Sequence, residues 1–466
     1  MTGKGKDMQI DREFLLKYDK PGPRYTSYPP APHFRKDYSE KECLKQIKKS
    51  NIEGNKNISL YIHIPFCPRQ CRYCGCTTEH FRKSDYIKSY VQAVMKEMDM
   101  VCRHLDLSRP VTMIHWGGGS PNSIYMDNIR LIMEKIAATF KLAENVEIAM
   151  ECEPSLITEA GLHDLSQAGI NRLSFGVQDL NAEVLRIVNR RPSKIPLKKL
   201  IPLCRDIGFE NINLDFIYGL PGQTVDSFKE TITKAVELDA DRLVTFSYAH
   251  VPWIKEHQKQ LEKYPLPGPE EKISMLLNSL DIITGAGYEF IGMDHFARKD
   301  DPLSHALQQG NLHRNFQGYA TRETTGQVYA FGASGISQFH NAYIQNRKTS
   351  ESYMKAVKRG DLPLECGYTL TEEDKFRRFI ITEIMCNSFL DIDLLCQKFN
   401  MERDAVLHKL ENEYLVLKKF KTDNLVECTH NGNIKVTSRG RLVVRNIAMV
   451  FDPLLQKKKA RYSRTV

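Results

Sequence analysis

The most constraining feature of the chain is a cluster of cysteines: four of its 12 fall within ten residues, in the segment IPFCPRQCRYCGC (64–76). Their spacing is C-x3-C-x2-C-x-C, and turns of this length bring three thiols to three corners of an iron–sulfur cube, whose ligands are thiolates. Arg69 and Arg72 lie between the cysteines, and we expect their charge to favour thiolates over thiols. Disulfide frameworks do not concentrate cysteines in this way, so the segment predicts a metal site.

Only three of the four cysteines are expected to hold the metal. Cys76 follows Cys74 after a single glycine, and C-x-C is a poor fit for adjacent corners of one cube. We therefore expect Cys67, Cys71 and Cys74 to ligate a [4Fe–4S] cluster and to leave one iron open as a Lewis acid, with Cys76 near the bound substrate. Zinc is the alternative, but a zinc site usually needs a second ligand pair, and the sequence shows no convincing one.

Apolar runs rich in β-branched and aromatic residues alternate with amphipathic stretches, which predicts βαβ units and a parallel sheet. The runs are 58–66, 111–118, 146–154, 172–178, 211–219, 242–249 and 288–296. The amphipathic stretches are 85–102, 127–139, 158–168, 195–206, 226–238 and 269–285. Right-handed crossovers should curl such units into a full or partial barrel, with ligand sites at the carboxyl ends of the strands.

A glycine-rich segment, GGGSP (117–121), lies at the end of the second run. Three glycines let a backbone approach a ligand closely. Most glycine runs are only tight turns, but this one follows the strand next to the cysteine segment, which favours a role in the same site.

The pattern changes after residue 350, where helical stretches dominate and a hairpin follows with Asn431–Gly432 as its turn. Three helices and a hairpin resemble a winged helix, a fold that binds DNA in some proteins and serves as a packing module in others. We therefore expect three parts: an N-terminal segment that covers the substrate, a barrel domain, and a smaller, mainly helical C-terminal domain. Their ranges are 1–50, 51–350 and 351–466.

The net charge is +9, and residues 401–466 alone contribute +7, with 14 Lys or Arg against 7 Asp or Glu. We interpret this basic end as a solvated tail without a nucleic-acid partner, because no aromatic residues interleave with the charges. The sequence has no apolar run of the roughly 20 residues that a membrane helix needs and no signal-peptide core at its start. These observations predict a cytoplasmic protein without a membrane partner.

Eight segments, spread over about residues 10–464, resemble the oxygen-independent coproporphyrinogen III oxidases of the radical SAM superfamily. They are YDKPGPRYTSYPPA (18–31), HIPFC (63–67), HWGGGSP (115–121), GVQD (176–179), NLDFIYGLPGQT (213–224), YAHVP (248–252), GMDHFA (292–297) and HRNFQGY (313–319). The resemblance implies an α/β fold with a partial (β/α)6-type barrel of parallel strands. It also implies two cofactors, a [4Fe–4S] cluster and S-adenosylmethionine (SAM).

The resemblance further implies a reaction. Reductive cleavage of SAM would give a 5′-deoxyadenosyl radical that drives the oxidative decarboxylation of two propionate side chains of coproporphyrinogen III to vinyl groups, yielding protoporphyrinogen IX. A reduced flavodoxin or ferredoxin would supply the electron, and we expect the enzyme to act as a monomer. The alternative is a haem chaperone or haem-modifying radical SAM protein, but Cys76 and the PGPRYTSYP segment argue against it.

Site residues follow from the positions that match the family. The residues expected to bind SAM are Tyr61, Gly118, Gly119, Ser120, Glu151, Gln178, Arg190 and Asp215. Those expected at a second SAM site, or in the space that the substrate takes, are Tyr73, Cys76, Ala249, Phe316, Gln317 and Ile336. The four propionates of the substrate need cations, for which charge and motif position suggest Arg24, Arg298 and Arg314.

Overall fold

A large, mostly parallel sheet forms the body of the computed structural model, which describes residues 12–455 and 462–464. In this part of the chain the sheet has 12 strands, in the order β16-β15-β14-β13-β1-β4-β5-β6-β7-β8-β10-β9. All neighbouring strands from β13 through β8 are parallel. The parallel strands are β1 (Ile58–Ile64), β4 (Pro110–Gly118), β5 (Lys141–Cys152), β6 (Arg172–Gln178), β7 (Asn211–Tyr218), β8 (Arg242–Ser247) and β13 (Gln327–Phe331).

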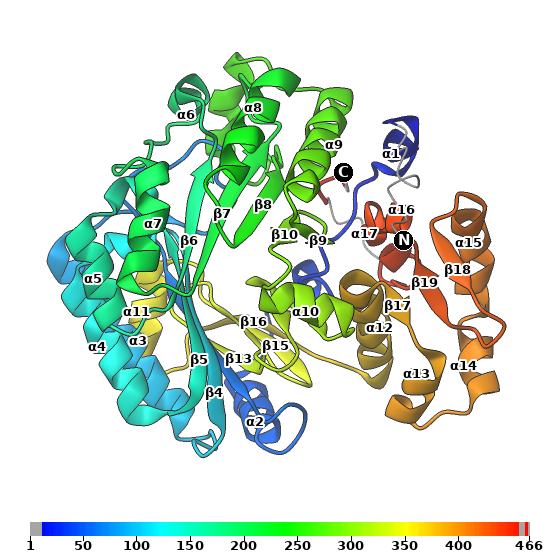
Figure 1. Ribbon diagram of the computed structural model, residues 1–466. Helices are drawn as coiled ribbons and strands as arrows, with labels where there is room; N and C mark the ends of the chain where they lie inside the picture. The colour runs from blue at the N-terminus through cyan, green and yellow to red at the C-terminus, as the bar shows by residue number, and fades with distance from the viewer. Residues whose placement is uncertain (1–11, 456–461, 465–466) are drawn as a thin grey trace.

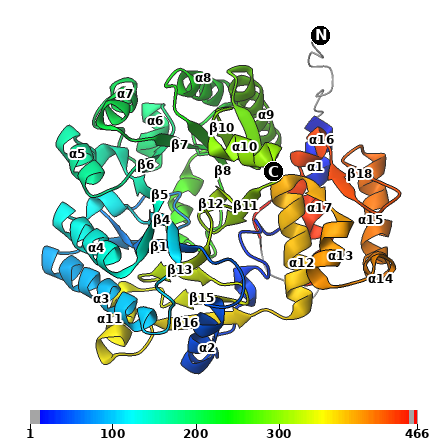
Figure 2. The same ribbon diagram turned by 60° about the horizontal axis from the view of Figure 1, so that its bottom comes forward.

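The sheet curls into an open barrel, and helices form a ring outside its strands (Figures 1 and 2). This arrangement confirms the predicted α/β fold with a partial barrel of parallel strands. The covering helices are α3 (Ser84–Cys102), α4 (Met126–Thr139), α5 (Glu159–Gln167), α6 (Ala182–Ile187), α7 (Leu197–Ile207), α8 (Val225–Val236), α9 (Pro269–Gly285) and α11 (Ser350–Arg359).

Helix α8 illustrates why these stretches are helical. It begins at Thr224, whose side chain forms a capping box with Ser227. Its buried residues include Phe228, Ile232 and Ala235, a spacing that places one apolar stripe against the sheet. The amphipathic pattern in the sequence therefore corresponds to a helix with one covered face.

Antiparallel strands extend the barrel at both edges. On one side they are β14 (Ile336–Gln338), β15 (Ala342–Asn346) and β16 (Leu364–Thr369), and on the other β10 (His295–Ala297) and β9 (Glu289–Gly292). The sequence predicts one strand over 288–296, but the chain reverses at Met293, which has a φ of 53°. The run therefore forms two short antiparallel strands instead of a further parallel one.

The barrel sheet continues past residue 350, because β16 pairs with β15 and α11 packs on α3. The mainly helical part begins at α12 (Glu372–Thr382), followed by a π-helical turn (Glu383–Asn387). The division of the chain into three parts at residues 50 and 350 stays a prediction.

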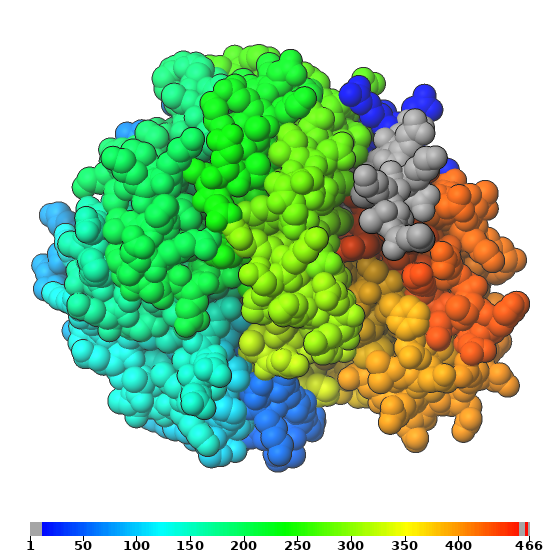
Figure 3. Space-filling view, in the orientation of Figure 1, coloured from blue at the N-terminus to red at the C-terminus, as the bar shows by residue number. Residues whose placement is uncertain are grey.

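The C-terminal part has the element order of a winged helix. After α12 come β17 (Phe389–Leu390), α13 (Ile392–Phe399), α14 (Arg403–Lys409), α15 (Glu411–Thr422), β18 (Val426–Cys428), β19 (Ile434–Val436), α16 (Ser438–Arg441) and α17 (Val444–Met449). The hairpin β18–β19 turns at Gly432, whose φ is 85°, at the predicted turn. Figure 3 shows this part, in orange and red, packed along one side of the barrel.

The N-terminal segment runs between the barrel and the C-terminal part. It holds α1 (Arg12–Tyr18) and leads to α2 (Glu40–Ser50) beside the barrel (Figure 1). The Tyr25 hydroxyl donates to Asp452 at 2.9 Å, and the Asn446 amide donates to the Tyr18 carbonyl at 2.8 Å. No helix in the described part of the chain is both long and apolar enough to cross a membrane.

A buried carboxylate ties the outer helix α3 to the edge of the barrel. Glu97 is 2% exposed and accepts hydrogen bonds from the Gly332 N–H at 2.9 Å, the Asn346 amide at 2.6 Å and the Tyr353 hydroxyl. Burial raises the pKa of Glu97 to about 7, although these three donors favour the charged form.

This raised pKa predicts a pH-dependent stability. Between pH 4.5, the ordinary pKa of a glutamate, and about pH 7, Glu97 is protonated in the folded chain and charged in the unfolded chain. Its contribution to the free energy of unfolding is therefore full below pH 4.5 and is lost as the pH rises through 7. Glu97→Gln removes the titrating group. We therefore expect the variant to keep the roughly 1–3 kcal/mol of unfolding free energy that the wild type loses over this pH range. Urea unfolding of both proteins at pH 5, 6, 7 and 8 measures it, and parallel pH profiles would contradict the prediction.

Candidate active site

The cysteine segment forms a loop at the carboxyl end of β1. Short strands close its base, where β2 (Phe66–Cys67) pairs in parallel with β3 (Glu79–His80). Cys67, Cys71 and Cys74 are free thiols of intermediate exposure on this loop. In the described part of the chain, no three His, Cys, Asp or Glu side chains lie close enough to share one metal ion.

A segment after β8 holds the backbone of this loop. The Gln258 amide, in the 3-10 helix Glu256–Lys263, donates to the Tyr73 carbonyl at 2.8 Å. The Lys255 ammonium donates to the Cys76 carbonyl at 2.6 Å. These contacts fix the loop before any cofactor binds, as a preorganised ligand set requires.

Arg190 supplies the guanidinium nearest to a cysteine. Its Nη1 donates to the Cys71 sulfur at 3.4 Å and pairs with Glu153 at 2.8 Å. Burial raises the pKa of the Cys71 thiol, while Arg190 acts in the opposite direction. Arg69 and Arg72, which the sequence suggested for this role, donate instead to neutral oxygens of the neighbouring segment.

The other cysteines have different surroundings. Burial raises the pKa of Cys67 to about 12, and its sulfur lies 3.6 Å from the Ser120 hydroxyl oxygen. The neighbouring Cys76 side chain holds the pKa of Cys74 below its usual range. Cys76 thus contacts a proposed ligand through its side chain.

The glycine turn after β4 packs directly on the cysteine loop. The Gly119 N–H donates to the Ile64 carbonyl at 2.7 Å, and the Ser120 N–H donates to the Phe66 carbonyl at 3.0 Å. A Cβ at Gly119 would lie 2.7 Å from the Phe66 oxygen, and Gly118 has a φ of 111°. The glycines therefore allow a close backbone approach, and a ligand here meets the carbonyl groups of the turn more readily than its occupied N–H groups.

Four predicted or neighbouring side chains form a connected group inside the barrel. The Tyr61 ring stacks on His115 with centroids 5.9 Å apart, and its hydroxyl lies 3.1 Å from His63 Nδ1. Nε2 of His115 lies 3.0 Å from a Glu151 oxygen. Burial pushes the pKa of Glu151 up, but His115 and the Gly118 N–H bring it below its usual range, so Glu151 is a carboxylate.

Buried polar atoms without partners lie among the residues expected to bind SAM. They are Oε1 of Gln178 and Nε of Arg190, and Gln178 has a φ of 73°. Asp215 accepts from the Asn213 amide at 2.8 Å and the Ser174 hydroxyl at 3.2 Å, and burial raises its pKa to about 6. Buried polar groups normally find a partner, so these atoms fit a polar ligand such as SAM.

The residues suggested for a second SAM or substrate space fall into two groups. Tyr73 and Ala249 come together, because the Gln258 amide donates to both the Tyr73 carbonyl at 2.8 Å and the Ala249 carbonyl at 3.3 Å, and the Cys76 carbonyl accepts from the nearby Lys255. Phe316 and Ile336 pack instead in a cluster around Tyr343, and the Gln317 N–H donates to Asn315 at 2.9 Å.

Two of the three suggested propionate-binding arginines lie in cavities, and the third does not. Arg24 lines a cavity of about 310 Å³ and pairs with Asp294. Arg314 lines one of about 710 Å³, is 7% exposed, and has Nε and Nη1 without partners. Arg298 donates to the Ala240 carbonyl at 3.3 Å, at the amino end of β8, so the structure does not bring it to the site.

Sequence reasoning missed four cations that line the smaller cavity: Lys272, Arg441, Arg445 and Arg464. Arg441 and Arg445 are four residues apart in SRGRLVVR, a spacing that places both on one face of a helical segment. That spacing was the available signal, and it lay in the C-terminal part, where we expected a winged-helix-like domain with a solvated basic tail.

Comparisons with known proteins find a matching family model and relatives over the full length of the chain. The model of the radical SAM superfamily matches residues 61–235. The oxygen-independent coproporphyrinogen III oxidase of Synechocystis sp. is 38% identical over 469 residues, covering 100% of both chains. The Escherichia coli enzyme of the same description is 39% identical over 454 residues, covering 97% of both chains.

A solved structure shows the same fold. It is coproporphyrinogen III oxidase from Escherichia coli, described as a radical SAM enzyme. The TM-score is 0.88 at 37% identity, and the match covers 95% of this chain and 98% of that one.

The cysteine loop yields a pair of predictions. Cys71→Ala should abolish the cluster, since two of the three expected thiolates remain. Cys76→Ser should keep the cluster, because we place Cys76 outside it, and should impair turnover. Iron and sulfide analysis after anaerobic reconstitution, together with the brown absorption, measures both. An intact cluster in Cys71→Ala, or its loss in Cys76→Ser, would show that the ligands are assigned wrongly.

Proposed function

The chain belongs to the family of oxygen-independent coproporphyrinogen III oxidases, and we propose that it converts two propionate side chains of coproporphyrinogen III to vinyl groups, giving protoporphyrinogen IX. It is a radical SAM oxidoreductase whose cofactors are a [4Fe–4S] cluster and SAM. The observation that carries the proposal is the convergence of the cysteine loop, the glycine turn and the unpartnered atoms of Gln178 and Arg190 at the carboxyl edge of one barrel.

We assign the cluster to Cys67, Cys71 and Cys74. When bound, the cluster and SAM would supply the one-electron chemistry that oxidises a propionate side chain, while the three thiols would hold the cluster. Gln258 and Lys255 hold the loop that carries the three thiols, through the carbonyls of Tyr73 and Cys76. A fixed loop keeps the thiols in one arrangement throughout turnover.

The SAM pocket follows from side chains at the ends of β1, β4, β5, β6 and β7. Glu151, held as a carboxylate by His115, suits the amino group of SAM, and Asp215 suits the ribose hydroxyls. Arg190 already pairs with Glu153, so it offers the SAM carboxylate its remaining Nε–H. The pocket as proposed comprises Tyr61, Gly118, Gly119, Ser120, Glu151, Gln178, Arg190 and Asp215.

The substrate space lies between the barrel and the N-terminal segment. Arg314 supports this placement, since two of its nitrogen atoms are buried without partners and its guanidinium lies over the Tyr319 ring at 5.0 Å. A carboxylate of the substrate would satisfy those atoms. Arg24 contributes less, because Asp294 already neutralises it.

Partners and location complete the proposal. A reduced flavodoxin or ferredoxin delivers the electron to the cluster, and the enzyme works as a cytoplasmic monomer. The basic C-terminal part packs against the barrel and has no nucleic-acid partner, a view that the contacts of α17 with the N-terminal segment support.

Reconstitution tests the function directly. We expect the cluster-loaded enzyme, given reductant, SAM and coproporphyrinogen III without oxygen, to release carbon dioxide and 5′-deoxyadenosine together. Cys71→Ala serves as the control and should release neither. Tight haem binding without carbon dioxide release would instead identify a haem chaperone.

The SAM pocket can be tested apart from turnover. Asp215→Ala should weaken SAM binding by about ten- to a hundredfold, since a hydrogen bond to a charged group contributes about 1.5–3 kcal/mol. Equilibrium dialysis against the cluster-loaded protein measures the affinity. Asp206→Ala, at an exposed carboxylate on α7, is the matched control, and equal affinities of the two variants would exclude Asp215 from the pocket.

A further inference from the structure

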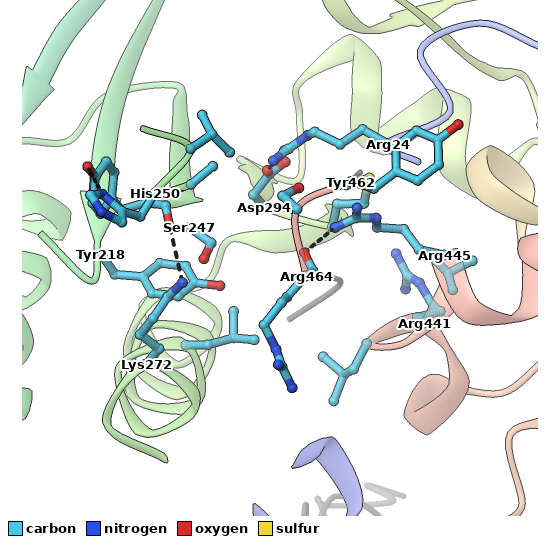
Figure 4. A pocket seen from close by; sticks show the side chains of 18 of the residues that line it. Arg24, Tyr218, Ser247, His250, Lys272, Asp294, Arg441, Arg445, Tyr462 and Arg464 are labelled. Atoms are coloured by element: carbon cyan, nitrogen blue, oxygen red, sulfur yellow. Dashed lines mark hydrogen bonds and ion pairs between the residues drawn. The ribbon is translucent and has the colours of Figure 1, made fainter. Parts of the chain in front are cut away.

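The cavity of about 310 Å³ lies at the carboxyl ends of β7 and β8, where these strands meet the C-terminal part. Figure 4 shows Tyr218, Ser247 and Lys272 along one wall and Arg441 and Arg445 along the opposite wall. The first wall belongs to the barrel and the second to α16 and α17. The cavity thus exists only because the two parts of the chain meet.

Positive charge dominates the lining. It holds five cations, Arg24, Lys272, Arg441, Arg445 and Arg464, against one carboxylate, Asp294. Asp294 pairs with Arg24, and Arg464 pairs with Asp19. A cavity lined by one sign of charge attracts the opposite ion.

The remaining three cations have only neutral partners among the described residues. Lys272 donates to the Tyr248 carbonyl at 3.1 Å, and Arg441 donates to the Ile291 carbonyl at 3.0 Å. Arg445 donates to the carbonyl of Pro23 at 3.1 Å and to others nearby. None of the three forms an ion pair with a described carboxylate, and Asp19, Glu289 and Asp294 act on them only through longer-range attraction.

Burial of these three cations also favours the binding of an anion. Burial, together with the nearby Arg24 and Arg314, lowers the pKa of Arg445 to about 9. Burial also lowers the pKa of Lys272 and of Arg441. Buried charges without a counterion destabilise a protein, so an anion in the cavity would be bound favourably.

We propose that this cavity is the subsite for a propionate carboxylate of the substrate that is not decarboxylated, held by Lys272 and Arg441. The inference rests on the proposed function. At about 310 Å³ the cavity lies at the small end of ligand pockets, so it admits a propionate arm and leaves the macrocycle in the barrel mouth. Ala249, which we place in the substrate space, lines the same cavity.

The neighbouring groups suit a carboxylate. Burial raises the pKa of Tyr218 to about 12, so its hydroxyl stays protonated and can donate. A Cβ at Gly219 would lie 2.8 Å from Cε of Lys272, so only glycine lets the lysine stem cross the end of β7 into the cavity. Arg445 donates to the carbonyls of Pro23 and Arg464, and so it positions the cavity wall that the C-terminal part forms.

Binding of a charged and an uncharged probe tests the subsite. The probes are coproporphyrin III and its tetramethyl ester, titrated by fluorescence quenching into the cluster-loaded enzyme without oxygen. Lys272→Met and Arg441→Gln should each weaken binding of the free acid about tenfold or more and change binding of the ester less than twofold. The KM for coproporphyrinogen III should rise with the free-acid Kd.

Matched controls are Lys234→Met and Arg359→Gln, which remove exposed cations on α8 and α11 and should leave both affinities unchanged. If the wild type and the cavity variants bind the free acid equally well, the proposed subsite is wrong. The proposed function would still stand in that case if the wild type releases carbon dioxide. A parallel loss for acid and ester would also overturn it, because the carboxylate would then not be what the cations contact. A wild type that neither binds the acid nor releases carbon dioxide would refute the proposed function itself.

Discussion

The backbone contact between the cysteine loop and the glycine turn is the constraint on which the rest of the site depends. Hydrogen bonds from Gly119 and Ser120 to the carbonyls of Ile64 and Phe66 join the ends of β1 and β4 at a distance that admits no side chain. Next to this contact, Arg190 links the Cys71 thiol to Glu153 after β5 and to the Gly176 carbonyl of β6. Except for Arg190, every residue that we assign to SAM lies at that junction or on the parallel strands β1 to β7.

Much of the architecture could be predicted because it follows from periodicity. Apolar runs with both faces buried became parallel strands, and the stretch 225–236 became a helix because its apolar residues repeat every three to four positions. The prediction of one strand over 288–296 was wrong. The composition of this run is that of a single strand, but a left-handed backbone conformation at Met293 divides it into two. Composition does not reveal a reversal of that kind.

The candidate site was predictable where a motif fixes its own geometry, and less so where partners come from distant parts of the chain. The cysteine spacing and the glycine turn indicated one shared loop region. Sequence could not show that Asp294 neutralises Arg24, that Arg298 lies at the opposite end of β8, or that Arg190 takes the place expected for Arg69 and Arg72. Ion pairs over such separations depend on tertiary packing, for which one sequence carries no local signal.

Arg445 binds the carbonyls of Gly22 and Pro23 on one side and that of Arg464 on the other, so the two ends of the chain meet at a single guanidinium. The contacts of Arg445 with Gly22 and Pro23 join residues more than 400 positions apart, and contacts over such separations form slowly. The barrel strands need no such contact with one another. A nascent chain can therefore complete the barrel and its cysteine loop while the cationic cavity, whose lining includes Arg441, Arg445 and Arg464, is still unformed.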